Sequence, residues 1–434
     1  MRVTKKLLEE EITQRQEEGC DTTPFAAALS LLSDEDTAGL SRLYDDIAAL
    51  RPEPSLEANE PSDLALIRGL RPSAVRARHA RFGEAELRDR IAGAWLGRAA
   101  GCLAGKPCEG WSHDAIRSYL EPAGLYPLDG YFPLVLPDRD GLGQRVPAQW
   151  WRGRIGLAPR DDDTDYTVLG LHLLEEHGPG FSTRQVADEW LTHLPYWQVY
   201  TAERVAYANL VNGLEPPETA SFRNPYREWI GAQIRADIFG YVNPGDPEAA
   251  AAMAYRDAAL SHVKNGIYGE MWAAACLAAA FVEPDPAAVI LAGLAEIPAE
   301  CRLAQALRRT LDWCRQDGDW DVTWHKLNDH YGHYHGVHTI NNACAVALAL
   351  LHGRLDFAAS VAIAVMCGWD TDCNGATVGS IVGAMLGRSR LPANWVTPLN
   401  DTLESAVQGF ARCSISSLAE RTLAQAEAVL AVRG

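Results

Sequence analysis

The stretch GWDTDCNGATVGSIVGAMLG, residues 368–387, joins two aspartates to a predicted helix that is almost entirely small or apolar. Asp370 and Asp372 stand directly at the start of this helix, and no basic residue lies near them in the sequence. Small residues recur along it at spacings of three and four. Because residues at these spacings share one helix face, a second helix can approach that face closely. The stretch therefore predicts a core helix with two carboxylates at its start.

Two carboxylates at the mouth of a core helix need a partner, because an unpaired buried charge is very costly. A hard divalent cation would satisfy Asp370 and Asp372. Helix capping is the alternative, since Asp, Thr and Asn are favoured at helix starts by the free N–H groups and the helix dipole. Taken alone, the stretch leaves both interpretations open.

A second small-residue helix lies in RIAGAWLGRAAGCLAGKPCEG, residues 90–110, where glycines recur every four residues at 93, 97, 101 and 105. Glycine costs about 1 kcal/mol in a helix interior relative to alanine, so four of them indicate close packing. The small face after Asp372 is the natural partner. The helix must end near Lys106-Pro107, which places Glu109 just beyond its end.

A further acidic cluster, RDDDTD at residues 160–165, leads into another helical pattern, TVLGLHLLEEHG. It follows a Pro-, Gly-, Tyr- and Trp-rich region, 121–159, which predicts a long loop of the kind that is usually functional. If this cluster faces Asp370 and Asp372, the carboxylates can hold two hard cations, Mg²⁺ or Mn²⁺. A solvated acidic helix start is the alternative for this cluster.

Composition limits the classes of partner. With 39 basic against 57 acidic residues the net charge is −18, which argues against general binding to nucleic acid or anionic membrane. The ten cysteines form no CxxC pair, a pattern typical of reduced, cytosolic thiols. No apolar run has signal-peptide or membrane-span character. We expect a cytoplasmic protein with no membrane partner; the oligomeric state is not predicted.

Helical periodicity dominates the chain, and all-α is the predicted fold class. The prolines and glutamates of 51–61 indicate a linker, so residues 1–80 are expected to form an N-terminal helical accessory segment. The predicted helices are 7–18, 24–32, 34–50, 184–194, 200–209, 247–259, 269–281, 286–294, 300–314, 342–351, 357–366 and 403–432.

The three motif segments, in this order, resemble the ADP-ribosylglycohydrolase family, which includes dinitrogenase-reductase-activating glycohydrolases and ADP-ribosyl-acceptor hydrolases. The resemblance covers roughly residues 87–391. It implies an orthogonal helical bundle that forms the catalytic domain, 81–434, and binds two Mg²⁺ or Mn²⁺ ions. It also implies hydrolysis of the ribosyl C1″ N- or O-glycosidic bond of an ADP-ribosylated or related small-molecule substrate.

The metal ligands implied by the resemblance come from both acidic clusters. Asp161 stands where the family usually has Thr or Ser, and Cys373 replaces a hydroxyl residue of the late motif. Since a thiol is a poor ligand for Mg²⁺, this second departure puts one metal position in doubt. The implied set is Asp161, Asp162, Asp163, Asp370, Asp372 and Cys373.

Two carboxylates are implied as catalytic groups. Glu109 matches the glutamate of the family's early GDxxGxPxE-like segment, in which Cys102 replaces the usual aspartate. Glu109 or Asp163 would act as general base, or stabilise the oxocarbenium-like transition state of ribosyl transfer to water. The alternative for Glu109 is a surface carboxylate after a helix end.

Two further segments are expected to line the pocket. Gly266, Tyr268 and Gly269 resemble the family's pocket wall, with a simple turn between helices as the alternative. The histidines at 325, 330, 333, 335 and 338 suggest zinc, but no HExxH motif or cysteine at ligand spacing accompanies them. We expect instead that loop residues of this segment contact substrate, namely His335, His338 and Asn341.

Two other functions stay open at this point. One is hydrolysis of a different ribosyl compound, such as a nucleoside derivative, which a small neutral pocket would favour over the large positive pocket expected for a diphosphate. The other is a non-catalytic metal-containing binding protein, since folds are reused without their chemistry.

Overall fold

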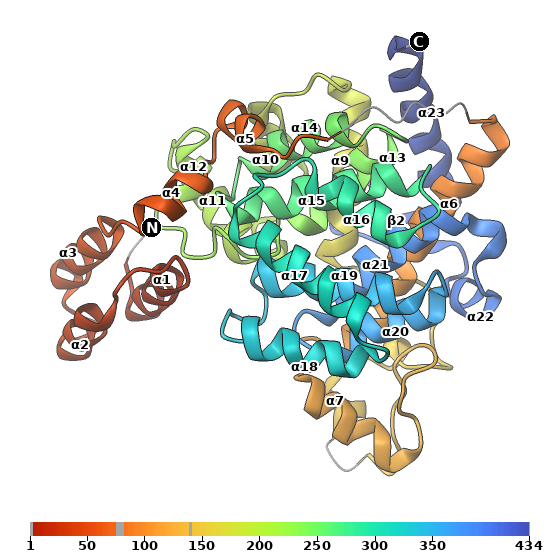
Figure 1. The fold of residues 1–434 in the computed structure, drawn as a ribbon, viewed down its shortest axis with the longest axis horizontal. Helices are drawn as coiled ribbons and strands as arrows, with labels where there is room; N and C mark the ends of the chain where they lie inside the picture. Colours follow the sequence, from red (N-terminus) through yellow and green to blue (C-terminus); the bar gives the residue numbers. More distant parts are fainter. Residues whose placement is uncertain (1–2, 75–81, 139–140, 434) are drawn as a thin grey trace.

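The computed structural model describes residues 3–74, 82–138 and 141–433 and shows an all-α bundle (Figure 1). An N-terminal extension of three helices stands beside the bundle at the left of the view, and the C-terminal helix projects at the upper right. The predicted fold class is therefore confirmed. The predicted boundary between residues 80 and 81 lies outside the described residues.

The helices and strands follow in chain order. The extension and linker hold α1 (Lys5–Glu17), α2 (Thr23–Leu31), α3 (Thr37–Ala48), α4 (Pro54–Asn59) and α5 (Leu64–Leu70). The first part of the bundle holds α6 (Glu84–Gly105), α7 (His113–Leu120), α8 (Leu142–Arg145), α9 (Asp162–His177), α10 (Thr183–His193), α11 (Thr201–Val211), α12 (Glu218–Ser221), α13 (Asp237–Tyr241) and α14 (Pro247–Ala258). The second part holds α15 (Asn265–Ala280), α16 (Pro286–Leu294), α17 (Arg302–Gln316), α18 (Trp320–Tyr331), α19 (Thr339–Gly353), α20 (Phe357–Met366), α21 (Thr371–Leu386), α22 (Ala393–Val396), β1 (Thr402–Glu404), β2 (Arg412–Ser414) and α23 (Ile415–Arg433).

The two small-residue helices pack on each other as the glycine spacing predicts. A methyl group added at Gly97 of α6 would lie 2.0 Å from the Gly379 carbonyl oxygen of α21, and one at Gly379 would lie 2.2 Å from that of Gly97. Backbone therefore meets backbone along this face, which no larger residue allows. The pair lies in the centre of the bundle, surrounded by the main hydrophobic core.

The helix predicted over residues 403–432 is wrong over residues 403–414. Residues 402–404 instead pair with 412–414 in an antiparallel hairpin, and the helix begins at Ile415. The turn contains Gly409 at φ +88°, a backbone conformation that no α-helix contains. Leu403 is fully buried, so its apolar spacing imitates a helical face while it serves a strand.

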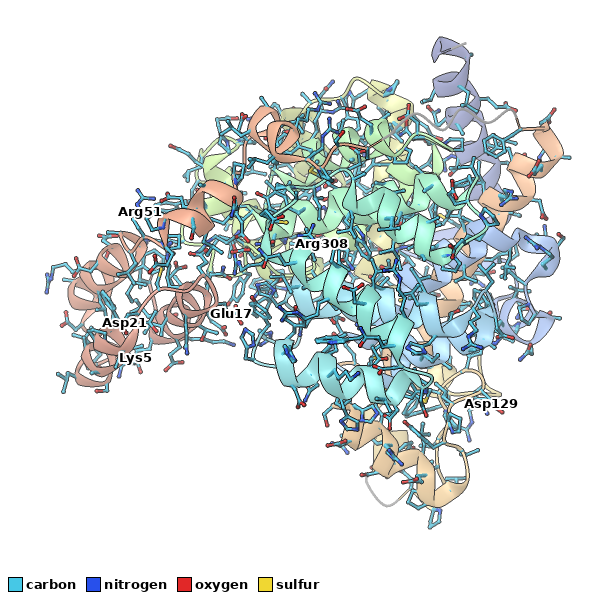
Figure 2. All side chains as sticks on the ribbon, in the orientation of Figure 1. Lys5, Glu17, Asp21, Arg51, Asp129 and Arg308 are labelled. Atoms are coloured by element: carbon cyan, nitrogen blue, oxygen red, sulfur yellow. The ribbon has the colours of Figure 1, made fainter. Side chains whose placement is uncertain are left out.

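The N-terminal extension has a small core of its own and is joined to the bundle by buried ion pairs. Its apolar cluster comes from α1 to α3, whereas Ile67 of α5 belongs to the core of the bundle. Arg227 of the bundle pairs with Glu11 at 2.8 Å and with Glu18 at 2.9 Å. Figure 2 shows Glu17, the last residue of α1, where the extension meets the bundle.

Two sequence expectations concern thiols and membranes. All ten cysteines fall within the described residues, and every one is free. Among the helices that the structure describes, none combines the length and apolar character of a membrane span.

Candidate active site

The end of α6 and the start of α21 are fixed against each other. Thr371 Oγ1 donates a 2.8 Å hydrogen bond to the Gly105 carbonyl. A methyl group added at Gly105 would lie 2.2 Å from the Thr371 carbonyl oxygen, so a larger residue there would push the two ends apart. The residues that follow α6 therefore lie directly beside Asp370 and Asp372.

The loop after α6 pairs with the segment before α21. The Gly110 N–H donates to the Trp369 carbonyl at 2.9 Å. Gly368 has a φ of +75°, and a side chain there would meet the backbone of this loop at 2.6 Å. This pairing holds Glu109 next to Asp370.

Asp161 caps α9 and orients the first acidic cluster. Its Oδ1 accepts the Asp163 N–H at 3.0 Å, and its Oδ2 forms an ion pair with Lys106 Nζ. The buried Arg98 donates hydrogen bonds of 2.9 and 2.7 Å to the Asp163 carbonyl and pairs with Asp237 at 2.7 Å. One Asp161 oxygen therefore caps α9, while the Asp163 carboxylate lies close to Asp372. We call this group of acidic side chains the carboxylate centre; it comprises Glu109, Asp161, Asp162, Asp163, Asp370 and Asp372.

Two carboxylate oxygens in this centre are buried without a hydrogen-bond partner, Asp163 Oδ2 and Asp372 Oδ1. Two groups of potential ligand atoms each lie within 4.8 Å of one another: Cys102, Asp161, Asp163 and Asp372 in the first, and Asp370, Asp372 and Cys373 in the second. Asp372 belongs to both groups. Unpartnered carboxylate oxygens gathered around a shared aspartate fit a hard divalent cation.

The acidic side chains of the centre repel one another. Burial and neighbouring carboxylates raise the pKa of Asp162, Asp163 and Asp370 well above the usual range. Burial and Glu109 raise the pKa of Asp372 to about 8. A cation bound among these groups would reverse the shifts, because it favours the ionised form of each ligand.

Lys106 neutralises part of this charge. Burial alone would raise the pKa of Asp161, but the Lys106 ammonium holds it below its usual value. The same ammonium lies 4.7 Å from the centre of the Trp150 ring. Asp165, the last acidic residue of the cluster, instead pairs with Arg160 at 2.7 Å and accepts the Ala406 N–H, so it faces away from the centre.

The centre opens on a cavity of about 560 Å³, within the range of small-molecule sites. Its acidic lining comprises Glu109, Asp161, Asp162, Glu203, Asp370 and Asp372. Its aromatic lining comprises Trp150, Tyr200 and Trp229. Charged groups and flat aromatic rings in one cavity are suited to a polar sugar joined to a planar base.

A second cavity of about 500 Å³ adjoins the first and shares Tyr200, Thr201 and Trp229 with it. Helix α1 of the extension supplies one wall, through Lys6, Leu7 and Glu10. The rest of the lining includes Tyr196, Arg204, Val205, Tyr226 and His335. The accessory segment therefore contributes to the surroundings of the site.

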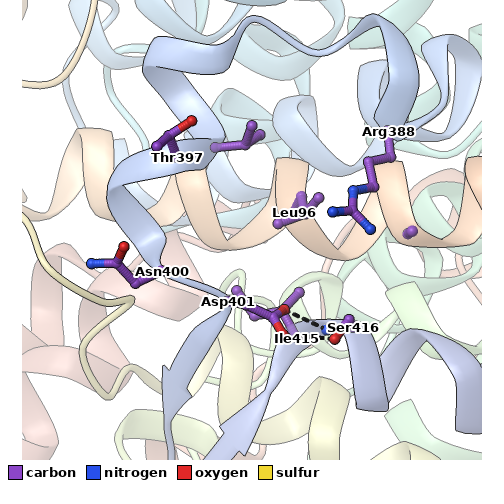
Figure 3. Close-up of a pocket in the computed structure, with 9 residues that line it drawn as sticks. Leu96, Arg388, Thr397, Asn400, Asp401, Ile415 and Ser416 are labelled. Carbon is purple, nitrogen blue, oxygen red and sulfur yellow. Dashed lines mark hydrogen bonds between the residues drawn. The ribbon is translucent and has the colours of Figure 1, made fainter.

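A third cavity, of about 320 Å³, is lined by Leu96, Arg388, Asp401 and Ser416 among others (Figure 3). Here the Asp401 carboxylate already accepts the Ser416 N–H at 2.7 Å and its hydroxyl at 2.6 Å. Its acidic group is therefore satisfied, in contrast to those of the carboxylate centre.

The structure brings the expected metal and catalytic residues together. Glu109, Asp370 and Cys373 line the first cavity along with Asp161 and Asp162. Their roles as ligands or as catalytic groups stay predictions. Asp163 does not line this cavity and is 1% exposed, so it lies behind the others.

The expected substrate contacts fall in different places. Gly266, Tyr268 and Gly269 lie in the fully buried first turn of α15, apart from the described linings of both cavities. Tyr268 donates to the Pro61 carbonyl, which anchors the linker to the bundle. Their direct contact with substrate stays a prediction that this placement does not favour.

The histidine segment reaches the site through His335 and Val337, of which Val337 lines the first cavity. His335 lines the second cavity and stacks on Trp229, with ring centres 4.1 Å apart. Asn341 donates to the His335 carbonyl at 3.1 Å, and His338 is fully buried with Nε2 3.9 Å from Glu17. None of the metal-competent groups in the described residues includes a histidine of this segment.

Sequence reasoning missed the aromatic walls and Lys106. Trp150 lies in the loop region 121–159, whose composition predicts a functional loop, so the sequence did indicate that it could line the site. Tyr200 and Trp229 carry no signal, because their position depends on how α11 and the loop after α12 pack.

The comparisons with known proteins agree with this architecture. Residues 83–430 match the family model described as ADP-ribosylglycohydrolase. The fold and this match define an all-α hydrolase of glycosidic bonds. Because the match takes in most of the chain, the protein belongs to the ADP-ribosylglycohydrolase family.

One solved structure and the curated proteins complete the comparison. A chain titled "ADP-ribosylglycohydrolase-related protein complex" superposes with a TM-score of 0.50 and 22% sequence identity, over 79% of this chain and 99% of that chain. At this identity it shows a shared fold. No curated protein matches the chain.

Proposed function

We propose that the protein is a metal-dependent hydrolase that cleaves the ribosyl C1″ N- or O-glycosidic bond of an ADP-ribosylated substrate. The observation that carries this proposal is the carboxylate centre, which has unpartnered oxygens on Asp163 and Asp372 and opens on a cavity with an aromatic lining. The family match supports the class of reaction. The metal and the ADP-ribosyl group are inferred from the residues of the site.

The two acidic clusters would hold Mg²⁺ or Mn²⁺, two ions if both ligand groups are filled. The ligands would be Asp161, Asp162, Asp163, Asp370 and Asp372, with Cys373 beside them. When bound, the metal supplies Lewis-acid polarisation of ribose oxygens and a water of lowered pKa. Lys106, already paired with Asp161, offsets part of the negative charge that remains.

Glu109 is the better placed of the two expected proton-transfer groups. It lines the cavity, whereas Asp163 is buried behind it and oriented by Arg98. Burial in the cavity and the Asp161 carboxylate raise the pKa of Glu109, and a carboxylate that lines the cavity can take a proton from a water bound there. We assign Glu109 the proton of the attacking water and Asp163 a ligand role.

The shape of the two adjoining cavities favours a dinucleotide-sized substrate over a nucleoside. Together they extend from the carboxylate centre past Trp229 to Lys6 and Arg204. The Arg204 guanidinium lies 5.2 Å from the centre of the Tyr200 ring, so a cation stands next to an aromatic face. This pairing suits a diphosphate that follows a stacked ring.

The test is release of free ADP-ribose from ADP-ribosylated protein, with and without added Mg²⁺ or Mn²⁺. The comparison is the Asp370→Ala/Asp372→Ala double variant, and the matched control is Asp401→Asn in the cavity of Figure 3. We expect metal-dependent release by the wild type and the control, and none by the double variant. The variant should stay folded, because neither aspartate pairs with a basic side chain in the described structure.

Two results would contradict the proposal. Full activity of the double variant would remove the carboxylate centre from the reaction. Absence of release by a wild type that still binds Mg²⁺ or Mn²⁺ would exclude ADP-ribosylated protein and favour a smaller ribosyl compound, such as a nucleoside derivative.

A further inference from the structure

Three histidines converge on one carboxylate between α9 and α10, which pack against each other. Glu189 lies 2.9 Å from His193 Nδ1 and 3.6 Å from His172 Nε2 through its Oε2 atom. Its other oxygen, Oε1, lies 3.0 Å from His177 Nε2. His172 is about 15 Å along α9 from Asp162, at 1.5 Å per residue. The cluster is therefore distinct from the carboxylate centre.

A chain of hydrogen bonds fixes which atoms of this cluster are free. Gln185 Oε1 accepts the Ser182 N–H at 2.8 Å, which turns its Nε2 toward His177 Nδ1 at 3.0 Å. His177 therefore accepts at Nδ1 and donates from Nε2 to Glu189 Oε1. The carboxylate is held in one orientation, with Oε2 turned toward His172 and His193. Such a support is typical of a metal ligand.

The remaining atoms lack hydrogen-bond partners. Glu189 Oε2 and His193 Nδ1 are both buried and, although 2.9 Å apart, they are not aligned for a hydrogen bond with each other. Both atoms are therefore available to a cation in the space among them and His172 Nε2, since the three atoms lie within 4.8 Å of one another. An unpartnered, nine-tenths buried carboxylate oxygen at this position is costly unless a cation occupies that space.

The distances fit a transition-metal ion in a distorted four-coordinate geometry. Two ligand atoms about 2.1 Å from a zinc ion lie about 2.9 Å apart at an angle of about 90° and about 3.6 Å apart at about 120°. These are the separations of Glu189 Oε2 from His193 and from His172. The two imidazole side chains are 21% and 16% exposed, which leaves room for water as the fourth ligand. Two nitrogen donors favour zinc over magnesium.

We propose that His172, Glu189 and His193 form a zinc site that joins α9 to α10 and is separate from the carboxylate centre. The site lies on the helix that begins with Asp162 and Asp163, and the His193 carbonyl accepts the Gln408 N–H at 2.9 Å. Metal binding there ties α9, α10 and the β-hairpin turn together. Its role is structural, and the reaction does not pass through it.

The test uses full-length protein, freed of metal by a chelator, in the Asp370→Ala/Asp372→Ala background. Zinc is added and measured by calorimetric titration and by metal analysis after gel filtration. We expect one zinc per chain and a raised midpoint of thermal unfolding. His172→Gln and His193→Gln should each lose both effects, whereas the control His325→Gln, at a 58% exposed side chain, should keep both.

A spectroscopic measurement keeps the proposal testable if the histidine variants do not fold. Cobalt(II) added to the Asp370→Ala/Asp372→Ala chain, in which the three ligands of the proposed zinc site are unchanged, should give visible absorption bands of nitrogen and oxygen coordination. The near-ultraviolet thiolate band that Cys102 or Cys373 would produce should be absent. Zinc binding of equal stoichiometry and affinity in folded His172→Gln and His193→Gln variants would overturn the proposal. So would a cobalt spectrum of the Asp370→Ala/Asp372→Ala chain that is dominated by thiolate ligation, or no metal uptake by that chain.

Discussion

Substitution of Gly97 by alanine tests the helix pair on which the site rests. The added methyl group would lie 2.0 Å from the Gly379 carbonyl oxygen, whereas real contacts of this kind are almost never shorter than 3.0 Å. Because backbone cannot rotate away, α6 and α21 must separate by at least about 1 Å. Overpacking of this kind costs about 1–3 kcal/mol and occasionally more. The glycine contacts at Gly93 and Gly101 would loosen with it, so we expect a loss near the upper end, about 3 kcal/mol.

The same displacement should reduce activity, because α21 carries Asp372 and the end of α6 leads to Glu109. A misplacement of about 1 Å at a catalytic centre costs on the order of 100-fold in rate. Guanidinium unfolding and ADP-ribose release measure the two effects, and Gly69→Ala is the control. Gly69 is exposed on α5 with nothing within 4 Å, so alanine there should be neutral or slightly stabilising. Wild-type stability and activity in Gly97→Ala would refute the backbone contact.

Two further predictions concern the extension. Burial raises the pKa of Glu17 from 4.5 to about 7. As the pH rises from about 4.5 through 7, Glu17 therefore loses its proton in the unfolded chain before it does so in the folded chain. The free energy of unfolding then falls, by up to about 3 kcal/mol at pH 8. Glu17→Gln should remove most of this loss, as measured by denaturant unfolding at pH 5 and pH 8; an unchanged pH dependence would contradict the role of burial. The double variant Lys6→Ala/Arg204→Ala should raise the KM for an ADP-ribosylated substrate about tenfold, as measured by steady-state kinetics. The KM for a ribosyl nucleoside without a diphosphate should stay unchanged. Equal changes for both substrates would place the diphosphate elsewhere.

The helix pair and the carboxylate centre could be predicted from the sequence because each rests on local chemistry. Glycine at every fourth position has a cost in a helix that close backbone contact explains, and the contact between Gly97 and Gly379 follows from it. Acidic residues at two core helix starts can share a cation, which made their meeting an expectation, although capping alone would also explain each cluster. Residues 403–432 show the limit of the same reasoning. The apolar spacing of these residues fits either a strand or a helix. The positive φ of Gly409, which excludes a continuous helix, exists only in the folded chain.

Helix α1 shows why the surroundings of the site could not be predicted. In the sequence, Glu11, Gln14 and Glu18 look like the solvated face of an amphipathic helix. In the structure they are at most 1% exposed, because Arg227 and Glu228, some 210 residues further on, pair with them. Periodicity states which side chains share a face but not which distant residue covers that face.

Helix α1 also affects the second cavity, because it supplies one wall of that cavity. Loss of α1 would uncover Arg227 and take away the carboxylates that pair with it. It would also remove Glu17 from the backbone of His335, whose ring stacks on Trp229 between the two cavities. The extension is therefore part of the architecture that holds the aromatic wall in place, although residues 1–82 lie outside the family match.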